Sequence, residues 1–176
     1  MMEKLVPNRE CGECTACCIN LRIEEASLKK HAGTPCSHLI EKKGCGIYGE
    51  RPEVCRNWYC AWRFMAQLDS EWRPDKSNIL LRFADDGLIL EAIKEPHTVL
   101  TSELALGIIG GGIEDGLSVS ISVRTKEGFC NSLVKLNDGL KSVIASRDGY
   151  RVRNAMLKAI NIALSQKTDP VSPLEN

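Results

Sequence analysis

This 176-residue chain has few aromatic side chains, only three histidines and no net charge. Lysine plus arginine equals aspartate plus glutamate at 23 each, so the chain lacks the excess positive charge with which proteins neutralise nucleic-acid phosphates. It has no apolar run long enough for a transmembrane helix, and no apolar stretch of signal-peptide length precedes Arg9. We therefore expect a cytoplasmic protein that binds neither membranes nor nucleic acid.

Cysteine is the residue that the chain has in excess. Apolar residues make up 43% and charged residues 26%, which is typical of a globular protein rather than a disordered one. The ninth cysteine, Cys130, stands alone. The other eight fall within one short segment, at Cys11, Cys14, Cys17, Cys18, Cys36, Cys45, Cys55 and Cys60.

The chain changes character near residue 75. We predict an α+β fold in which an irregular, helical, cysteine-rich metal module at 1–75 precedes an α+β domain of unknown role at 76–168 and a frayed tail at 169–176. The predicted helices are 24–31, 52–68, a segment from Ser102 to the glycines at 110–112, 138–146 and 150–165. The predicted strands, taken as antiparallel, are 78–84, 87–93, 117–124 and 129–136, with a hairpin turn at Asp85-Asp86-Gly87.

The opening cysteines are spaced as Cys11-x-x-Cys14-x-x-Cys17-Cys18. A two-residue gap lets two thiolates of one turn reach the same ion, and both zinc sites and iron–sulfur loops use it. Side chains of neighbouring residues point in different directions, so Cys17 and Cys18 are awkward ligands for one ion. We expect them to serve different metals, to form a bridge, or to divide into one ligand and one reserve thiol. Cys55 and Cys60 would not share a face of a regular helix.

Arginine and histidine residues also bear on the cysteine segment. The segment contains five arginines that are candidates to compensate a negative metal–thiolate centre, or else are solvated: Arg9, Arg22, Arg51, Arg56 and Arg63. Buried hydrophobic cysteines or a disulfide framework are the alternatives to metal binding, and the density and the expected reducing compartment disfavour both. We expect Cys130 to be a core residue beside Phe129, and His31, His38 and His97 to be surface or packing residues.

The cysteine segment resembles the zinc- or iron-chelating domain family known by its CxxCxxCC pattern. The resemblance covers about residues 9–65. It rests on the opening motif, on Cys36-x-x-Leu39, on Gly44-Cys45-x-Ile47-Tyr48-x-x-Arg51-Pro52-x-x-Cys55-Arg56, and on Cys60. The family implies a metal site made by the eight clustered cysteines, with zinc or an iron–sulfur cluster bound. Some relatives with this pattern act as flagellin lysine N-methylases, which implies an enzyme as the alternative.

Three functions stay open at this point. The first is a metal- or cluster-binding protein without catalysis; the second is a metal- or cluster-dependent enzyme; the third is a structural zinc module that supports a binding domain. Eight cysteines exceed the four ligands of one closed zinc site. The glycine-rich stretch 108–113 lacks the strand-to-helix context of a nucleotide loop, and the acidic pairs Asp85-Asp86 and Glu114-Asp115 precede glycine as ordinary turns do.

Overall fold

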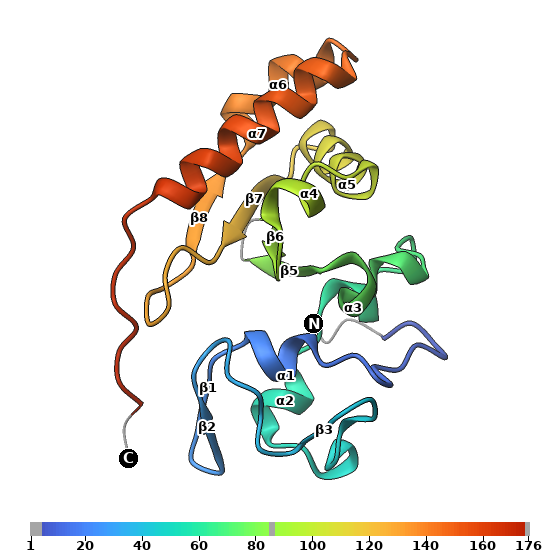
Figure 1. Cartoon of the computed structure of the whole chain (residues 1–176). Helices are drawn as coiled ribbons and strands as arrows, with labels where there is room; N and C mark the ends of the chain where they lie inside the picture. Colours follow the sequence, from blue (N-terminus) through green and yellow to red (C-terminus); the bar gives the residue numbers. More distant parts are fainter. Residues whose placement is uncertain (1–4, 85–86, 175–176) are drawn as a thin grey trace. The chain divides into compact units, whose positions relative to one another are not determined.

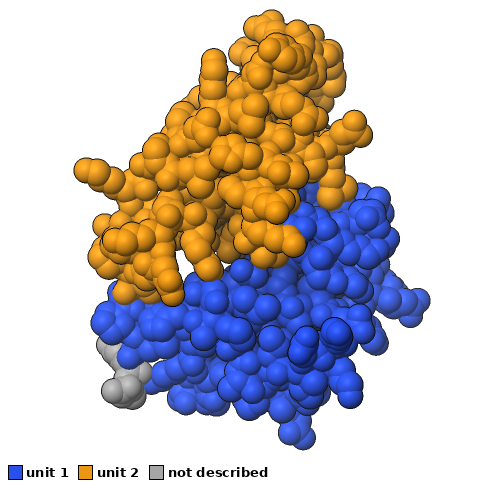
Figure 2. Space-filling model, viewed as in Figure 1, with its two compact units in different colours: residues 1–80, 172–176 blue, residues 81–171 orange. Residues whose placement is uncertain are grey.

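The structure, a computed structural model, describes residues 5–84 and 87–174, and it contains both helices and strands as predicted for an α+β fold (Figure 1). The chain divides into two compact units, coloured separately in Figure 2. Unit 1 comprises residues 1–80 and 172–176, and unit 2 comprises residues 81–171. Within the described ranges, no helix combines the length and the apolar character that crossing a membrane requires.

Unit 1 is built from very short elements, and none of those lying wholly within its described residues is longer than five residues. Two small antiparallel hairpins pair β1 (Ile23–Glu25) with β2 (Leu28–Lys30), and β3 (Leu39–Ile40) with β4 (Gly44–Cys45). The helical elements are α1 (Ala16–Asn20), η1 (Tyr48–Glu50), α2 (Glu53–Asn57), η2 (Ala61–Arg63), η3 (Ser70–Trp72) and α3 (Pro74–Ser77).

Two helices predicted for this segment are wrong. The segment 24–31 contains one large apolar residue, Leu28, so a helix there would have no apolar stripe to bury; it folds into the β1–β2 hairpin, which buries Ile23 and Leu28. The helix predicted at 52–68 ends as α2 at Asn57, and a 3₁₀ turn follows only at Ala61.

Arg9 explains why the chain after η2 does not continue as a helix. Its guanidinium donates hydrogen bonds to four main-chain carbonyls: Trp62, Met65, Ala66 and Leu68. In a continuous helix, these carbonyls would accept from backbone N–H groups four residues further on. A side chain more than fifty positions away in the sequence thus takes the place of helical hydrogen bonds.

Unit 2 is organised by a four-stranded sheet in the order β5-β6-β7-β8. The strands are β5 (Ile79–Ala84), which begins in unit 1, β6 (Gly87–Ala92), β7 (Ser118–Val123) and β8 (Ser132–Lys135). The antiparallel arrangement that we predicted holds for β7 and β8, whereas β6 and β7 are parallel. Parallel strands need a long crossover, and α4 (Pro96–Val99) and α5 (Glu103–Glu114) lie in it. Asp85 and Asp86 of the predicted hairpin turn lie outside the described residues.

The core of unit 2 lies between the sheet and its helices. All of β6 is buried, and so is β7 after its first residue, as expected of strands covered on both faces. Helix α5 packs on β7, while α7 (Gly149–Ser165) packs on β7, β8 and α6 (Asn137–Ala145) (Figure 1). Leu90, Ile121 and Met156 are among the side chains that this packing removes fully from solvent.

The predicted cap of α5 is present, but its predicted end is not. The Ser102 hydroxyl accepts a hydrogen bond from the Ala105 N–H, and the helix continues through the three glycines to Glu114. Gly112 faces β7, where an added Cβ would lie 3.0 Å from the Val119 side chain. The glycine allows a close approach of helix and strand, and this packing keeps a weak helix former helical.

Cys130 is exposed, so the prediction that it belongs to the core is wrong. Strand β8 begins two residues later than Cys130, at Ser132, and the Cys130 N–H donates to the carbonyl of Asp169. The segment predicted as a frayed tail is hydrogen-bonded here, because Pro170 bridges to Phe129 and the Val171 N–H donates to Gly128.

Candidate metal centre

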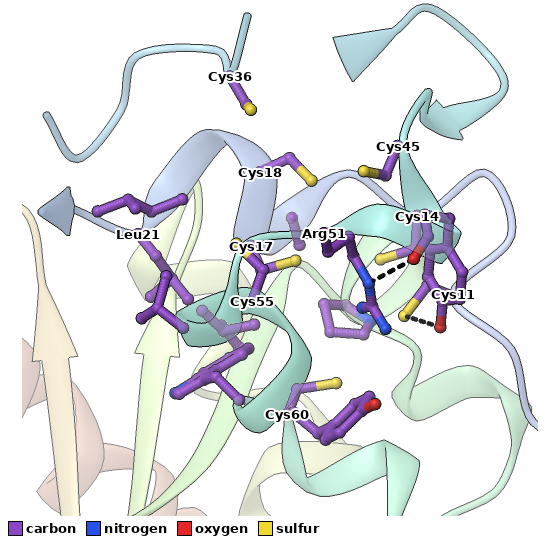
Figure 3. A pocket seen from close by; sticks show the side chains of 18 of the residues that line it. Cys11, Cys14, Cys17, Cys18, Leu21, Cys36, Cys45, Arg51, Cys55 and Cys60 are labelled. Atoms are coloured by element: carbon purple, nitrogen blue, oxygen red, sulfur yellow. Dashed lines mark hydrogen bonds between the residues drawn. The ribbon is translucent and has the colours of Figure 1, made fainter. Parts of the chain in front are cut away.

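All eight clustered cysteines line one cavity of about 210 Å³ in unit 1 (Figure 3). The lining thiols are those predicted from the sequence: Cys11, Cys14, Cys17, Cys18, Cys36, Cys45, Cys55 and Cys60. They come from separate elements, including α1, the β3–β4 hairpin and α2. The fold therefore gathers them, although they are spread over 50 residues of sequence. Cys130 is not among the lining residues.

Backbone contacts hold the cysteine-bearing loops around the cavity. The Cys14 N–H donates to the Cys11 carbonyl at 2.9 Å, which closes the first turn, and the Cys36 N–H donates to the Cys18 carbonyl at 3.0 Å. Gly44 adopts a φ of +84°, and an added Cβ would overlap the carbonyl oxygen of Gly12. The β3–β4 hairpin can therefore approach the first cysteine loop only because residue 44 is glycine.

Backbone N–H groups point at several of the sulfurs. The N–H of His38 donates to Cys36 Sγ at 3.5 Å, and the N–H groups of Ala16 and Ile47 donate to the sulfurs of Cys14 and Cys45. Trp62 and Arg63 do the same for Cys60. Each sulfur thus receives a donor from two residues further along the chain. Such donors favour the thiolate over the neutral thiol, and metals bind the thiolate.

Burial acts in the opposite direction on the same thiols. It raises the pKa of Cys14 to about 11 and that of Cys60 to about 12, and it also raises the pKa values of Cys45 and Cys55. These thiols stay protonated at neutral pH in the metal-free protein, because burial penalises the charged form. Metal binding here would release protons, and the affinity would fall as the pH is lowered.

The adjacent Cys17 and Cys18 are not equivalent. A hydrogen bond between the two sulfurs, with burial added, raises the pKa of Cys17 above its ordinary range. The same hydrogen bond lowers the pKa of Cys18, helped by the nearby charges of Lys30 and Arg51.

Three of the five candidate arginines line the cavity, namely Arg22, Arg51 and Arg63. The Arg51 guanidinium lies 3.8 Å from the centroid of the Tyr48 ring, and its Nε donates to the Tyr48 carbonyl. Arg63 is only 6% exposed, and its Nε and Nη1 have no hydrogen-bond partner in the described part of the chain. A buried cation with unsatisfied donors is costly unless a negative charge lies beside it.

Arg22 also has other partners, because it pairs with Glu24 at 2.8 Å and donates to the carbonyls of Ser172 and Pro173. Arg9 does not line the cavity and binds main-chain carbonyls in and after η2. Arg56 is exposed on α2. Arg73, which the sequence reasoning did not single out, also lines the cavity, but Asp75 neutralises it at 2.7 Å.

Three further residues near the thiols were missed from the sequence. The Tyr48 hydroxyl lies 3.7 Å from Cys11 Sγ as a hydrogen-bond donor, and Tyr59 lies under the guanidinium of Arg63 at 5.4 Å. Lys30 is buried and donates to the carbonyls of Ile19, Leu21 and His31. Tyr48 and Tyr59 lie close to Cys45 and Cys60 in the sequence, and this proximity is the signal that could have identified them. Nothing in the sequence pattern distinguishes Lys30 from its neighbours.

The histidines contribute little to the cavity. His38 lines it, His31 is exposed, and His97 in unit 2 is hydrogen-bonded to Asn161 at 2.8 Å. Among the residues that the structure describes, no three Cys, His, Asp or Glu side chains are already arranged to hold one metal ion. The thiols surround a space rather than a point, so a metal would draw them together, as is usual where metal binding is coupled to folding.

The donor set nevertheless fits a metal–thiolate centre in its chemistry. Eight soft sulfur ligands select zinc, copper(I) or iron–sulfur clusters. The N–H groups aimed at the sulfurs and the unsatisfied donors of Arg63 both complement negative charge in the cavity. Comparisons with protein-family models, with curated proteins and with solved structures found no match to this chain.

Proposed function

We propose that this protein binds zinc or an iron–sulfur cluster through the cysteines between Cys11 and Cys60, and that metal binding is its primary biochemical property. The supporting observation is that one cavity is lined by all eight of these thiols (Figure 3). The resemblance of residues 9–65 to the CxxCxxCC family agrees with this proposal. A bound zinc would hold the loops of unit 1 together, whereas a cluster would also supply electron transfer.

The geometry favours metal binding over the two alternatives for the cysteines. All nine cysteines are free, so no disulfide framework accounts for the clustering. Cysteines that served only as small hydrophobic residues would leave no space between them, whereas these eight surround a cavity of about 210 Å³, although three of them also contact an apolar cluster. They also lie beside the buried charge of Arg63, which a purely apolar cluster does not explain.

The test is to purify the full chain without oxygen and to measure metals, acid-labile sulfide and visible absorption. Iron with sulfide and a brown colour establishes a cluster, and colourless protein with stoichiometric zinc establishes a zinc protein. Protein that contains neither, and that takes up neither zinc nor iron with sulfide, contradicts the proposal.

Two matched serine variants locate the site. Cys14→Ser removes a cavity thiol and is expected to lower the metal content substantially. Cys130→Ser removes the one cysteine outside the cavity and is expected to leave the metal content unchanged, because Cys130 is exposed in unit 2. Equal metal loss from both variants would show that the cavity is not the binding site.

A further inference from the structure

We propose that the eight thiols form two separate four-thiolate sites, with the adjacent Cys17 and Cys18 assigned to different sites. The first site consists of Cys11, Cys14, Cys17 and Cys60, and the second of Cys18, Cys36, Cys45 and Cys55. This division rests on the proposed metal-binding function and specifies how its ligands are shared. Thiolate centres for zinc and for iron–sulfur clusters each take four protein ligands, so two groups of four use every thiol of the cavity.

The first group is defined by the opening loop and the start of η2. Cys11 and Cys14 belong to one hydrogen-bonded turn and lie side by side in Figure 3. The charges of Cys11 and Cys14 act on Cys60. They also act on Cys17, where only the charge of Cys18 has a larger effect. Cys60 precedes η2, whose first turn supplies the N–H donors to its sulfur.

The second group is defined by packing as well as by charge. Cys18, Cys36 and Cys55 pack into one small apolar cluster with Ile23 and Leu28. The Cys36 N–H donates to the Cys18 carbonyl, which ties two members together directly.

Cys45 joins the second group through the β3–β4 hairpin. Its strand partner Leu39 packs against the same apolar cluster. The cysteines whose charges act on Cys45 are Cys18 and Cys36, and those acting on Cys55 are Cys18, Cys36 and Cys45. In Figure 3, Cys36, Cys18 and Cys45 lie together at one end of the cavity, opposite Cys60.

Helix α1 explains how neighbouring cysteines reach different sites. Cys17 and Cys18 are consecutive in Ala16–Asn20, so their side chains diverge by about 100° around the helix axis. Cys17 lies within electrostatic range of Cys11 and Cys14, whereas Cys18 packs against the apolar cluster of the second group. The helix therefore supplies one ligand to each side.

The positive groups near the thiols serve both groups of cysteines. Arg51 lies close enough to act on Cys18, Cys45 and Cys55, and Cys11 acts on it in turn. Lys30 is within range of Cys36, Cys18 and Cys55 in the second group and of Cys17 in the first. Each four-thiolate zinc site carries a charge of about −2, so two adjacent sites need this compensation more than one site does.

A footprinting experiment tests the division without any mutation. The metal of the anaerobic protein is withdrawn in steps with a chelator, exposed thiols are pulsed with N-ethylmaleimide, and the modified cysteines are mapped by mass spectrometry. Cys130 is exposed and should be modified from the start, so only the eight cavity thiols are counted. We expect a population with four modified cavity thiols, all from the same group. Chains that pass directly from none to eight modified cavity thiols, or that carry modifications mixed between the groups, overturn the division while leaving the proposed function intact. Protein that binds no metal at all overturns both.

Paired variants give a second test in which the number of thiols removed is constant. Cys11→Ser with Cys14→Ser removes two ligands of one group, and about half of the metal is expected to remain. Cys14→Ser with Cys45→Ser removes one ligand of each group, and almost all of the metal is expected to be lost. Equal metal content in the two double variants overturns the division.

Discussion

The two units of this protein reach an ordered structure by different means. Unit 2 has a sheet with two fully or nearly fully buried strands and helices of up to 17 residues, so ordinary hydrophobic packing holds it together. The described residues of unit 1 form hairpins of two or three residues per strand and helices of at most five. Isolated elements of that size are unstable in water. The comparison shows that regular secondary structure cannot be what stabilises unit 1.

Turns, loops and side chains that bind main-chain carbonyls replace regular secondary structure in unit 1. Arg9 binds four carbonyls, the Trp62 indole N–H donates to the Asp69 carbonyl at 2.9 Å, and Lys30 binds three more carbonyls. Small domains with so little regular structure usually depend on disulfides or a metal, and the cysteines here are free. Metal binding would therefore contribute a large share of the stability of unit 1.

The largest predicted effect is the unfolding of unit 1 on metal removal, and it follows from the dependence of this unit on metal. Removing the metal with a chelator under reducing, anaerobic conditions should unfold unit 1 and leave unit 2 folded, because structural zinc contributes roughly 10–16 kcal/mol to a small domain. Hydrogen exchange measured by mass spectrometry checks this separately for peptides from 5–80 and from 81–171. If removal of the metal lowered protection against hydrogen exchange equally in both units, or in neither, the stability of unit 1 would not depend on metal more than that of unit 2 does.

The two units also differ in how much of their structure could be predicted from the sequence. In unit 2 the strict alternation at 117–124 predicted β7, although its serines turn out to be buried as well, and the capping residue Ser102 predicted the start of α5. The parallel pairing of β6 and β7 was not predicted, since a period of two does not encode strand direction. The helix through Gly110–Gly112 was also missed, because packing of Gly112 on Val119 overrides the low helix propensity of glycine.

In unit 1 the sequence selected thiols that the fold brings to one cavity, but it did not predict their secondary structure. The spacing of the cysteines selected the eight thiols that line the cavity. The helices at 24–31 and 52–68 were wrong, because turns, buried Arg9 contacts and close approaches such as Gly44 on Gly12 determine the chain path there. Such contacts are distant in sequence and leave no periodic signal. The buried charge of Arg63 likewise appears only in the three-dimensional structure.

A smaller effect, confined to unit 2, comes from truncating its core. Ile121 is fully buried in β7, so Ile121→Ala should lower the free energy of unfolding of unit 2 by about 2–5 kcal/mol. Leu133→Ala in the neighbouring strand β8 is the matched control, because Leu133 is half exposed, and its effect should stay below about 0.5 kcal/mol. Denaturant unfolding measures both. The metal content of Ile121→Ala should be unchanged, and a parallel loss of metal would mean that the units are not independent.

The smallest predicted effect is that of a single substitution, Arg63→Gln, which should change metal binding without reducing the stability of metal-free unit 1. Arg63→Gln removes the buried charge beside the cavity, and it should weaken metal binding by about 10- to 100-fold, as loss of a group supporting the ligands usually does. In the metal-free protein the same change should not reduce stability, because two guanidinium nitrogens of Arg63 lack hydrogen-bond partners among the described residues. Competition with a chelator of known affinity measures the first effect, and denaturant unfolding of the metal-free protein measures the second.

Two further variants show whether the charge itself is responsible. Arg63→Lys keeps the positive charge and should recover part of the metal affinity, whereas Arg56→Gln removes an exposed arginine of α2 and should change it less than about twofold. A role for Arg63 in folding alone predicts lower stability with and without metal, in equal measure. A role in compensating the thiolates predicts opposite responses of the two states, because the charge is costly in the empty cavity and favourable only once the metal–thiolate centre has formed.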